Sequence, residues 1–301
     1  MLSGAAARLA VVALLLLAVG AAVGAAIAAA GGAVTGAVLV GLLEAAAYVG
    51  GARLALSALA ARPVGEVEQP GLYRLVRELS KAGRLPVPRL YLSPAEQPNA
   101  FTVGRAPRTA AVCCTAGLLK TLDETELRAV LAHELAHVSG RDILPGTASA
   151  GLATLITFPA GLVRFLPTRS AARTAPAPSG SPPAGGPAGS GLGLLEATLM
   201  LVLGPIAALI IRLTVTPAAE YRADAAGALL SGEQVALASA LRKIDAGTAE
   251  LALAPDGRLT SVGHLMIASP FRAEGFAGLF RTHPPTGERV RRLEALAGYR
   301  R

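Results

Sequence analysis

Two long apolar runs near the N-terminus constrain this chain more than any other feature. Residues 9–30 hold no charged side chain over 22 positions, which is long enough to cross the hydrocarbon core of a bilayer. A second run at about residues 33–52 follows Gly31 and Gly32, and Glu44 is its only charge. A cleaved signal peptide is the weaker interpretation, because the first run is too long and the second follows almost at once. The two runs therefore predict a transmembrane helical hairpin that turns at the two glycines.

The composition of the chain agrees with lipid as part of its solvent. Only 16% of the residues are charged and 52% are hydrophobic, whereas ordinary soluble domains are about 25% charged. The net charge of +8 comes from basic residues in polar segments beside the apolar runs, which predicts contact with an anionic membrane surface. No basic run is interleaved with aromatic residues, so we expect no nucleic acid partner. Glu44 in hydrocarbon is either functional or turned toward a partner, and the sequence leaves both open.

The polar segment after the hairpin, residues 60–141, has the pattern of a small region of mixed helices and strands. Its spacing predicts a helix, three strands and a second helix, in the order 71–83, 88–93, 100–104, 109–117 and 121–140. Thr121 and Glu124 have the spacing of a capping box at the start of the second helix. Cys113 and Cys114 are adjacent, so we expect them on opposite faces of a strand, without a disulfide between them.

The remainder of the chain is first apolar and then polar. Residues 143–163 and 192–215 are apolar and predict a second hairpin, whose depth in the membrane stays open. Between them, residues 167–191 are rich in Pro, Gly, Ser and Ala, and we expect them to be disordered. Residues 216–301 are polar and helical, and Thr216-Pro217 has the pattern of a helix N-cap followed by proline at the first helical position.

The sequence His133-Glu134-Leu135-Ala136-His137 carries the strongest functional signal. In the helix predicted there, the two histidines lie one turn apart on one face and can bind one tetrahedral metal ion. Zinc lowers the pKa of a bound water to about 7, and a neighbouring carboxylate can then take its proton. A chance pattern on a solvated face is the alternative. The flanking residues are apolar, however, so both imidazoles would be partly buried and would need partners.

A catalytic zinc needs a third protein ligand and one open position. No third histidine follows nearby, so we expect a carboxylate from a later helix. Glu220 and Asp224 lie four residues apart in the helix that starts at Pro217. One of them can bind the metal while the other orients a ligand, or both can lie on a solvated acidic face with Arg222 between them.

The order of these motifs resembles that of the HtpX-type membrane zinc metalloproteases, which are related to the CAAX prenyl proteases. The chain has H-E-L-A-H and then E-Y-R-A-D-x-x-G-A after two apolar spans, as in that family. Pro98–Phe101 is similar to the family's P-N-A-F segment, and Thr282–Pro285 is similar to its T-H-P-P segment. The likeness covers nearly the whole chain. The likeness departs at Thr102-Val103-Gly104, where two smaller residues are expected before the glycine. We expect this departure to make no contact with the metal site.

The resemblance implies a role for each matching residue. His133, His137 and Glu220 match the family's ligands of one zinc ion, and Glu134 matches its general base. Asp224 matches the acidic residue four positions after the third ligand. Asn99, Ala100 and Phe101 match an edge strand that pairs with an extended substrate. His283 and Arg289 are expected to face the cleft, where they could stabilise the oxyanion.

We therefore expect an α+β fold: a mainly helical membrane protein with transmembrane hairpins and a zincin-like catalytic domain that has a small edge-strand sheet. The expected domains are an N-terminal hairpin at 1–59, a first part of the protease domain at 60–141, a second apolar hairpin at 142–215 with the linker 167–191, and a second part of the protease domain at 216–301. The positive-inside rule predicts a multi-pass protein of the cell membrane, with its catalytic domain in the cytoplasm.

The expected function is that of an integral membrane zinc metalloendopeptidase acting on polypeptides. The resemblance implies unfolded or membrane proteins as substrates, and a role in membrane-protein quality control or stress response. One alternative is a prenyl-protein peptidase with the same chemistry, but two to four spans are too few for a large intramembrane chamber. Another is a membrane scaffold without activity, which the intact set of His133, Glu134, His137 and Glu220 disfavours.

Overall fold

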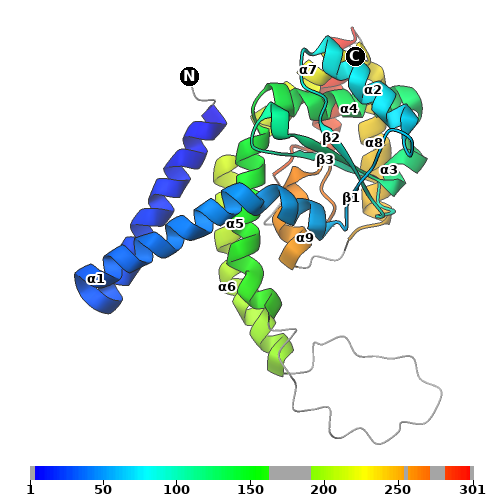
Figure 1. The fold of residues 1–301 in the computed structure, drawn as a ribbon. Coiled ribbons are helices and arrows are strands. Elements are labelled where there is room, and N and C mark those ends of the chain that lie inside the picture. The colour runs from blue at the N-terminus through cyan, green and yellow to red at the C-terminus, as the bar shows by residue number, and fades with distance from the viewer. Residues whose placement is uncertain (1–3, 163–190, 254–256, 272–281, 299–301) are drawn as a thin grey trace, which may run out of the picture.

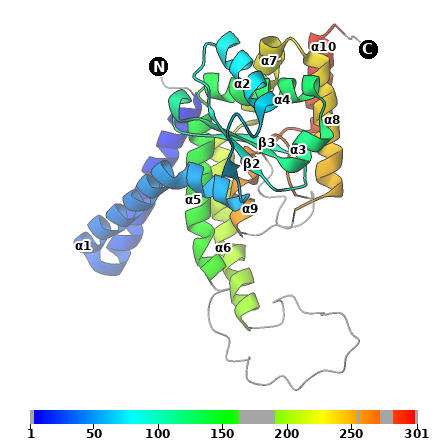
Figure 2. The same cartoon turned by 45° about the vertical axis from the view of Figure 1, so that its right-hand side comes forward.

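A computed structural model describes residues 4–162, 191–253, 257–271 and 282–298 of the chain. The described part is mainly helical and has one four-stranded sheet, which confirms the predicted α+β class (Figures 1 and 2). All but the last residue of the linker expected at 167–191 lies outside the described residues.

The N-terminal hairpin is formed by α1 (Gly4–Ala58), which consists of two arms joined by a break (Figure 1). The backbone leaves the helical region at Ala28 and Ala29, and Ala29 has a φ of +51°. The arms correspond to apolar spans at Ala6–Ala29 and Gly31–Ala58, each long and apolar enough to cross a membrane. The hairpin is confirmed, but the turn predicted at the two glycines is wrong, because the chain reverses before them.

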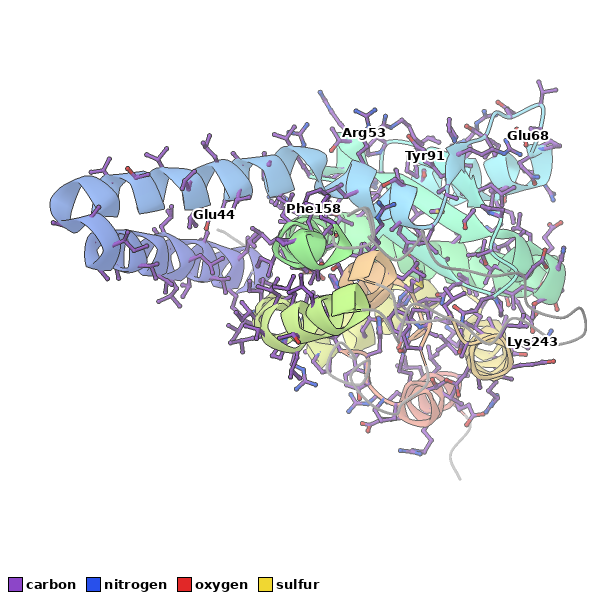
Figure 3. All side chains as sticks on the ribbon, turned by 90° about the horizontal axis from the view of Figure 1, so that it is seen from below. Glu44, Arg53, Glu68, Tyr91, Phe158 and Lys243 are labelled. Atoms are coloured by element: carbon purple, nitrogen blue, oxygen red, sulfur yellow. The ribbon has the colours of Figure 1, made fainter. Side chains whose placement is uncertain are left out.

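Glycines hold the two arms of α1 together instead of forming the turn. A Cβ atom on Gly24 would lie 1.9 Å from the carbonyl oxygen of Gly32, and one on Gly36 would lie 2.0 Å from that of Gly20. Small residues let helix backbones approach closely where the solvent is lipid and there is no hydrophobic force between helices. Glu44 lies in the middle of the second arm, and its carboxylate points between the arms (Figure 3).

The sheet consists of β1 (Arg62–Pro63), β2 (Arg89–Ser93), β3 (Ala100–Val103) and β4 (Ala111–Thr115), in the order β1-β2-β4-β3. β2 and β4 are parallel, while the other two pairings are antiparallel. The last three strands match the three predicted from sequence. The order leaves β3 as an edge strand, next to β4 and not to β2.

Each face of the sheet packs against its own set of helices. Leu90, Val112 and Cys114 share a core with α2 (Pro70–Ala82), α4 (Glu124–Ser139) and α8 (Gln234–Glu250). Phe101 and Cys113 on the other face pack against the end of α1, α5 (Ile143–Leu162) and α9 (Gly257–Val262). The two cysteines are buried, free and on opposite faces, as predicted. Burial raises the pKa of the Cys113 thiol to about 12.

The helix that carries the H-E-x-x-H sequence, α4, begins later than predicted. Its capping box joins Asp123 and Glu126, whose side chains each accept a hydrogen bond from the other's backbone N–H. Thr121 is instead the last residue of the short helix α3 (Ala116–Thr121). The predicted box failed because Asp123 has the same spacing to a glutamate and is also a preferred N-cap residue.

The second apolar pair is α5 and α6 (Gly191–Thr214), which run side by side (Figure 1). The apolar window of α5 is 67% buried inside the molecule, against 6% for each arm of α1, so α5 is the central helix of this bundle. α5 and the second arm of α1 come into close contact where a Cβ on Gly151 would lie 2.8 Å from the carbonyl oxygen of Ala47.

The last part of the chain returns to the sheet and α4. After a bend of 48°, α6 is followed by α7 (Pro217–Ser231), which packs against α4. Thr216 and Pro217 begin α7 as predicted, although the Thr216 hydroxyl makes no capping bond. A short 3₁₀ turn, η5 (Gly263–Leu265), and α10 (Thr286–Leu296) complete the described chain, with α8 and α10 lying side by side (Figure 2).

Candidate active site

The three residues of the H-E-x-x-H sequence are brought to one buried position by α4. His133 is 0% exposed and Glu134 is 2% exposed, while the His137 side chain keeps 17% of its exposure. The Nε2 atoms of the two histidines lie 3.3 Å apart. Burial lowers the pKa of His137 to about 4, so this imidazole is neutral at pH 7 and its nitrogen lone pair is available to a metal.

Glu220 is placed beside both histidines by α7. Its Oε1 lies 3.5 Å from Nε2 of His137, and its Oε2 lies 3.8 Å from Nε2 of His133. The helices approach this closely because residue 227 is a glycine: a Cβ there would lie 2.7 Å from the backbone nitrogen of His133. The ligands expected from sequence are thus brought together, from segments far apart in the chain.

The donor atoms of these three residues fit a zinc ion. They all lie within 4.8 Å of one another. Ligand atoms about 2.05 Å from a tetrahedral zinc are about 3.3 Å apart. The two Nε2 atoms are 3.3 Å apart and Oε1 of Glu220 is 3.5 Å from Nε2 of His137, which is close to that value, while the contact with His133 is made by the other oxygen, Oε2, at 3.8 Å. Two imidazole nitrogens and one carboxylate oxygen are donors that suit zinc. With three protein donors, one tetrahedral position is left for water or substrate.

Asp224 fixes the orientation of His133. Its Oδ1 lies 3.0 Å from Nδ1 of that ring, a distance at which Nδ1 can carry the hydrogen and leave the lone pair of Nε2 for a metal. Burial would raise the pKa of Asp224, but the charge of Arg289 and hydrogen bonds from it and from His133 hold that pKa at about 2. The sequence left the roles of Glu220 and Asp224 interchangeable, and the geometry separates them.

Arg289 lies behind the metal ligands and does not face the cleft. Its Nε and Nη2 donate to the two carboxylate oxygens of Asp224 at 2.8 and 2.7 Å, and its Nη1 donates to the carbonyl of Ile267 at 2.7 Å. The side chain is 2% exposed, and Nη1 is also 3.6 Å from Glu220. Arg289 is not among the residues that line the cleft, contrary to the expected position, and its expected role at the oxyanion stays a prediction.

His283 also lies against Glu220, with Nδ1 3.4 Å from its Oε2. It is not among the residues that line the cleft beside the metal ligands. Its expected role at the oxyanion stays a prediction, and the contact that the structure shows is the one with the carboxylate. A different histidine, His264, lines the cleft.

Glu134 lines the same cleft as His137, and its carboxylate also contacts the sheet. Thr102 of β3 donates a hydrogen bond from Oγ1 to its Oε2 at 2.7 Å. Burial raises the pKa of Glu134 to about 7, while the charge of His133 and the Thr102 hydroxyl act against that rise. We expected the departure at Thr102 not to touch the site, and this expectation is wrong, since Thr102 bonds the general-base candidate directly.

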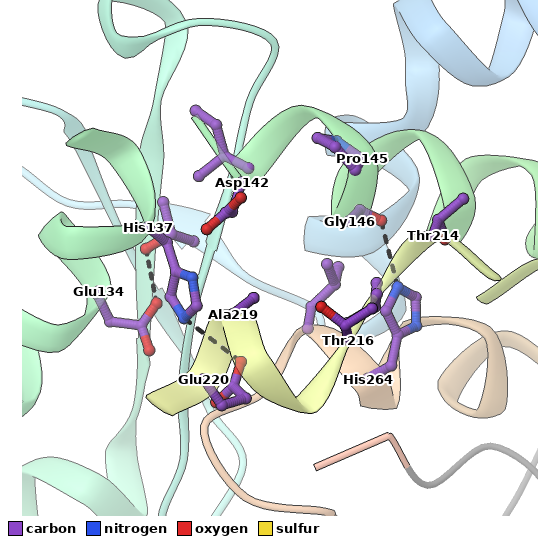
Figure 4. Close-up of a pocket in the computed structure, with 14 residues that line it drawn as sticks. Glu134, His137, Asp142, Pro145, Gly146, Thr214, Thr216, Ala219, Glu220 and His264 are labelled. Atoms are coloured by element: carbon purple, nitrogen blue, oxygen red, sulfur yellow. Dashed lines mark hydrogen bonds and ion pairs between the residues drawn. The ribbon is translucent and has the colours of Figure 1, made fainter. Parts of the chain in front are cut away.

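The cleft beside these residues is small, with a volume of about 50 Å³. Figure 4 shows His137 between Glu134 and Glu220, with His264 farther along beside Gly146. His264 is held there by Ser149 and by the carbonyl of Gly146, each 3.2 Å from its Nε2. The walls come from the first turn of α5, the end of α6 and the start of α7, so the cleft opens where the apolar helices end.

The sequence profile of peptidase family M48 matches residues 66–297 of the chain, which include every residue of this site. The chain belongs to peptidase family M48. It is 50% identical over 266 residues to the "Protease HtpX homolog" of Kineococcus radiotolerans, which covers 88% of this chain and 86% of that protein. It is 43% identical over 261 residues to the homolog of Paenarthrobacter aurescens, with 86% and 84% covered.

The M48 membership and these relatives identify the chain as an HtpX-type membrane metalloprotease and confirm the resemblance stated from its motifs. A crystal structure of S. mikatae Ste24p aligns with 85% of this chain and 56% of its own, at 19% identity and a TM-score of 0.41.

The edge strand expected to pair with substrate in this M48 protein is partly occupied by the chain itself. Phe101 forms a bridge with Met266, and the backbone N–H of Ile267 donates to the carbonyl of Ala100 at 2.9 Å. The Asn99 side chain donates to the carbonyl of Ala268 at 3.0 Å. Substrate pairing at Asn99–Phe101 stays a prediction, and it requires this segment to move.

Three residues of the M48 site were missed by sequence reasoning. Thr102 had a signal, since it departs from the family pattern beside the edge strand. Gly227 had another, because it is the glycine within the matched E-Y-R-A-D-x-x-G-A segment. His264 had no signal in the sequence, because a lone histidine in a polar segment indicates no partner and no cleft.

Proposed function

We propose that this chain is an integral membrane zinc metalloendopeptidase in which His133, His137 and Glu220 hold one Zn²⁺. The observation that supports the proposal most directly is the cluster of one donor atom from each of these three residues, all within 4.8 Å of one another. A purely structural zinc site would fill its fourth position from the protein. Within the described residues, no further His, Cys, Asp or Glu joins this set as a ligand.

The bound zinc would lower the pKa of a water molecule and polarise the substrate carbonyl. Glu134 takes the proton of the attacking water and passes it to the leaving amine. Burial raises the pKa of Glu134 to about 7 in the metal-free protein, and a pKa closer to the working pH than that of an exposed carboxyl helps the group both to accept and to release a proton. Thr102 holds one oxygen of this carboxylate, which leaves the other free for the water.

Asp224 and Arg289 act on the metal through His133 and Glu220. The Asp224 carboxylate holds the His133 ring in the tautomer that binds metal, and Arg289 holds Asp224 through two hydrogen bonds. Both side chains are buried, so the pair keeps a fixed geometry behind the ligands. We assign them to positioning, and we assign the proton transfers to Glu134.

We further propose that the protein is multi-pass, with the catalytic domain facing the cytoplasm, and that it takes part in membrane-protein quality control. The orientation rests on the basic residues that follow the α1 hairpin. The substrate class rests on the position of the cleft, whose walls include the ends of the apolar helices α5 and α6. A polypeptide leaving a bilayer would meet the cleft there. Unfolded or membrane proteins are the substrates that this placement favours.

The test compares the wild-type protein with Glu134→Gln, both purified in detergent. Bound zinc is measured in each, and each is incubated with casein as an unfolded substrate. The proposal expects one zinc per chain in both and cleavage by the wild type alone. Absence of zinc from both after metal resupply would overturn the metal site. Equal cleavage by both proteins would overturn the role of Glu134.

A further inference from the structure

A second cavity, of about 550 Å³, lies between the end of α1 and the sheet. Its lining comes from the last turns of α1, from β2 and β4, and from the loop that follows β3. It shares no lining residue with the cleft beside Glu134. Its volume falls in the range of small-molecule sites, roughly 300–1,000 Å³. The proposed peptidase chemistry gives this cavity no role.

Three arginines give the cavity its charge: Arg53 of α1, Arg89 of β2, and Arg105 of the loop after β3. No aspartate or glutamate is among its lining residues. Several other arginines of the described residues form ion pairs with carboxylates. Arg53, Arg89 and Arg105 form none within that part of the chain. Guanidinium groups match the geometry of phosphate oxygens, so the cavity suits a phosphate-bearing anion.

One wall of the cavity comes from a helix that is apolar enough to cross a membrane. The wall formed by α1 belongs to the apolar span Gly31–Ala58. Val49, in this wall, is 66% exposed. Next to it, Tyr48 lies under the guanidinium of Arg105, 5.3 Å from ring centroid to Cζ. Tyrosine is enriched where a span leaves the hydrocarbon, and arginine beside it meets the headgroups. Figure 3 shows Arg53 at this end of α1, beside Tyr91 of the sheet.

We propose that this cavity binds the headgroup of an anionic phospholipid. The phosphate lies among Arg53, Arg89 and Arg105, and the acyl chains follow the apolar surface of α1 back into the bilayer. A free phosphate would use the arginines but not the apolar wall, which is why we commit to a lipid. A bound headgroup joins α1, β2 and the loop after β3, and so fixes the sheet to the membrane surface.

The test uses the full chain in detergent and native mass spectrometry, which counts lipids retained by the protein. Phosphatidylglycerol is compared with zwitterionic phosphatidylcholine at equal concentrations. We expect one phosphatidylglycerol to be retained under conditions that remove phosphatidylcholine. The variant Arg53→Gln/Arg89→Gln/Arg105→Gln should bind at least about tenfold more weakly, since each basic residue near a membrane surface contributes about 1 kcal/mol.

The matched control removes the same charge elsewhere. Arg74, Arg77 and Arg128 are partly or largely exposed and pair with glutamates on the α2 and α4 side, and their triple glutamine variant should retain phosphatidylglycerol as the wild type does. Equal retention by the cavity variant and this control would overturn the proposal. Equal retention of both lipids by the wild type would also overturn it. Complete displacement of the lipid by millimolar inorganic phosphate would assign the cavity to a free anion instead.

A second variant keeps the test decisive if the glutamine variant is unstable. Replacing the same three arginines by lysine preserves the charge and removes the fork geometry. We expect this protein to prefer phosphatidylglycerol still, with weaker binding than the wild type. If a folded lysine variant no longer preferred phosphatidylglycerol to phosphatidylcholine, the proposal that the cavity selects lipids by their negative charge would be contradicted.

Discussion

Gly227 of α7 lies directly against the backbone of His133 of α4: a Cβ atom at position 227 would be 2.7 Å from both the nitrogen and the Cα of that residue. The contact involves backbone atoms, so no side chain can rotate to make room. It sets the distance between the helix that carries the histidines and the helix that carries Glu220. The metal site thus depends on a residue that has no side chain.

Gly227→Ala is expected to separate α4 and α7 and to weaken metal binding. Overpacking of this kind costs about 1–3 kcal/mol, and here the strain falls on the ligand geometry. We expect a lower zinc content after dialysis against a mild chelator, together with a lower midpoint of thermal unfolding. Gly71→Ala, in a helix where a Cβ meets nothing within 4 Å, is the control. Unchanged zinc retention in Gly227→Ala would show that the contact can relax.

Thr102→Val is expected to reduce turnover while leaving the metal in place. The change keeps the shape of the side chain and removes the hydroxyl that donates to Glu134 at 2.7 Å. A hydrogen bond to a charged group contributes about 1.5–3 kcal/mol, so kcat/KM should fall by roughly 10- to 100-fold. The hydroxyl lowers the pKa of Glu134, so the acid limb of the pH profile should move to higher pH.

Two controls separate this effect from general damage at Thr102. Thr102→Ser keeps the hydroxyl and should retain most of the activity. Thr248→Val removes a buried hydroxyl on α8, where it donates only to the backbone of the preceding turn, and should leave the pH profile unchanged. An unshifted acid limb in Thr102→Val would contradict the proposed coupling to Glu134.

Asp224→Asn is expected to weaken the affinity for metal while leaving the three ligands His133, His137 and Glu220 in place. The amide has nearly the shape of the carboxylate, but it no longer selects the His133 tautomer that binds metal, and it removes the nearer of the two carboxylates beside the buried Arg289. Loss of such a partner lowers metal affinity by about 10- to 100-fold. Titration with a chelator of known affinity measures this, and Glu96→Gln on the surface is the control. An affinity equal to that of the wild type would contradict the proposed role of Asp224.

The metal-free protein is expected to lose stability as pH rises, because of Glu134. Burial raises its pKa in the folded protein to about 7, above the ordinary value of 4.5, so its favourable contribution is complete below pH 4.5 and is lost as pH rises through 7. Glu134→Gln does not titrate. The thermal midpoint of the metal-free variant, minus that of the metal-free wild type, should therefore grow between pH 5 and pH 8. His137 is common to both proteins and does not contribute to this difference. A constant difference would show that Glu134 titrates normally.

Local sequence patterns predicted the elements and the cluster of His133, His137 and Glu220 well, because each pattern reflects a local physical constraint. His133 and His137 share a helix face by spacing alone, and Pro217 marks the start of the helix that carries Glu220. The capping box at Thr121 failed because Asp123 offered an equivalent pairing two residues on. Such competition between neighbouring caps is decided by tertiary packing.

The parts that sequence could not predict depend on contacts between distant segments. Arg289 carries a charge that could equally face solvent, substrate or Asp224, and only the packing of α10 on α7 decides among them. The same holds for Gly32, which could make a turn or a close contact, and which makes the contact because Gly24 lies opposite. The covered edge at Ala100 depends on Met266 and Ile267, more than 160 residues later in the chain.

The apolar pair α5 and α6 lies between the two halves of the ligand set in chain order, and this has a consequence for biogenesis. His137 leaves the ribosome about 80 residues before Glu220, and at roughly 5–20 residues per second that interval lasts several seconds. During it, the nascent protein has two of three metal ligands and must still insert or pack its second apolar pair. The set of three ligands can be completed only after both apolar helices have been synthesised, so the order of the chain itself delays activity until the second apolar pair is available to pack.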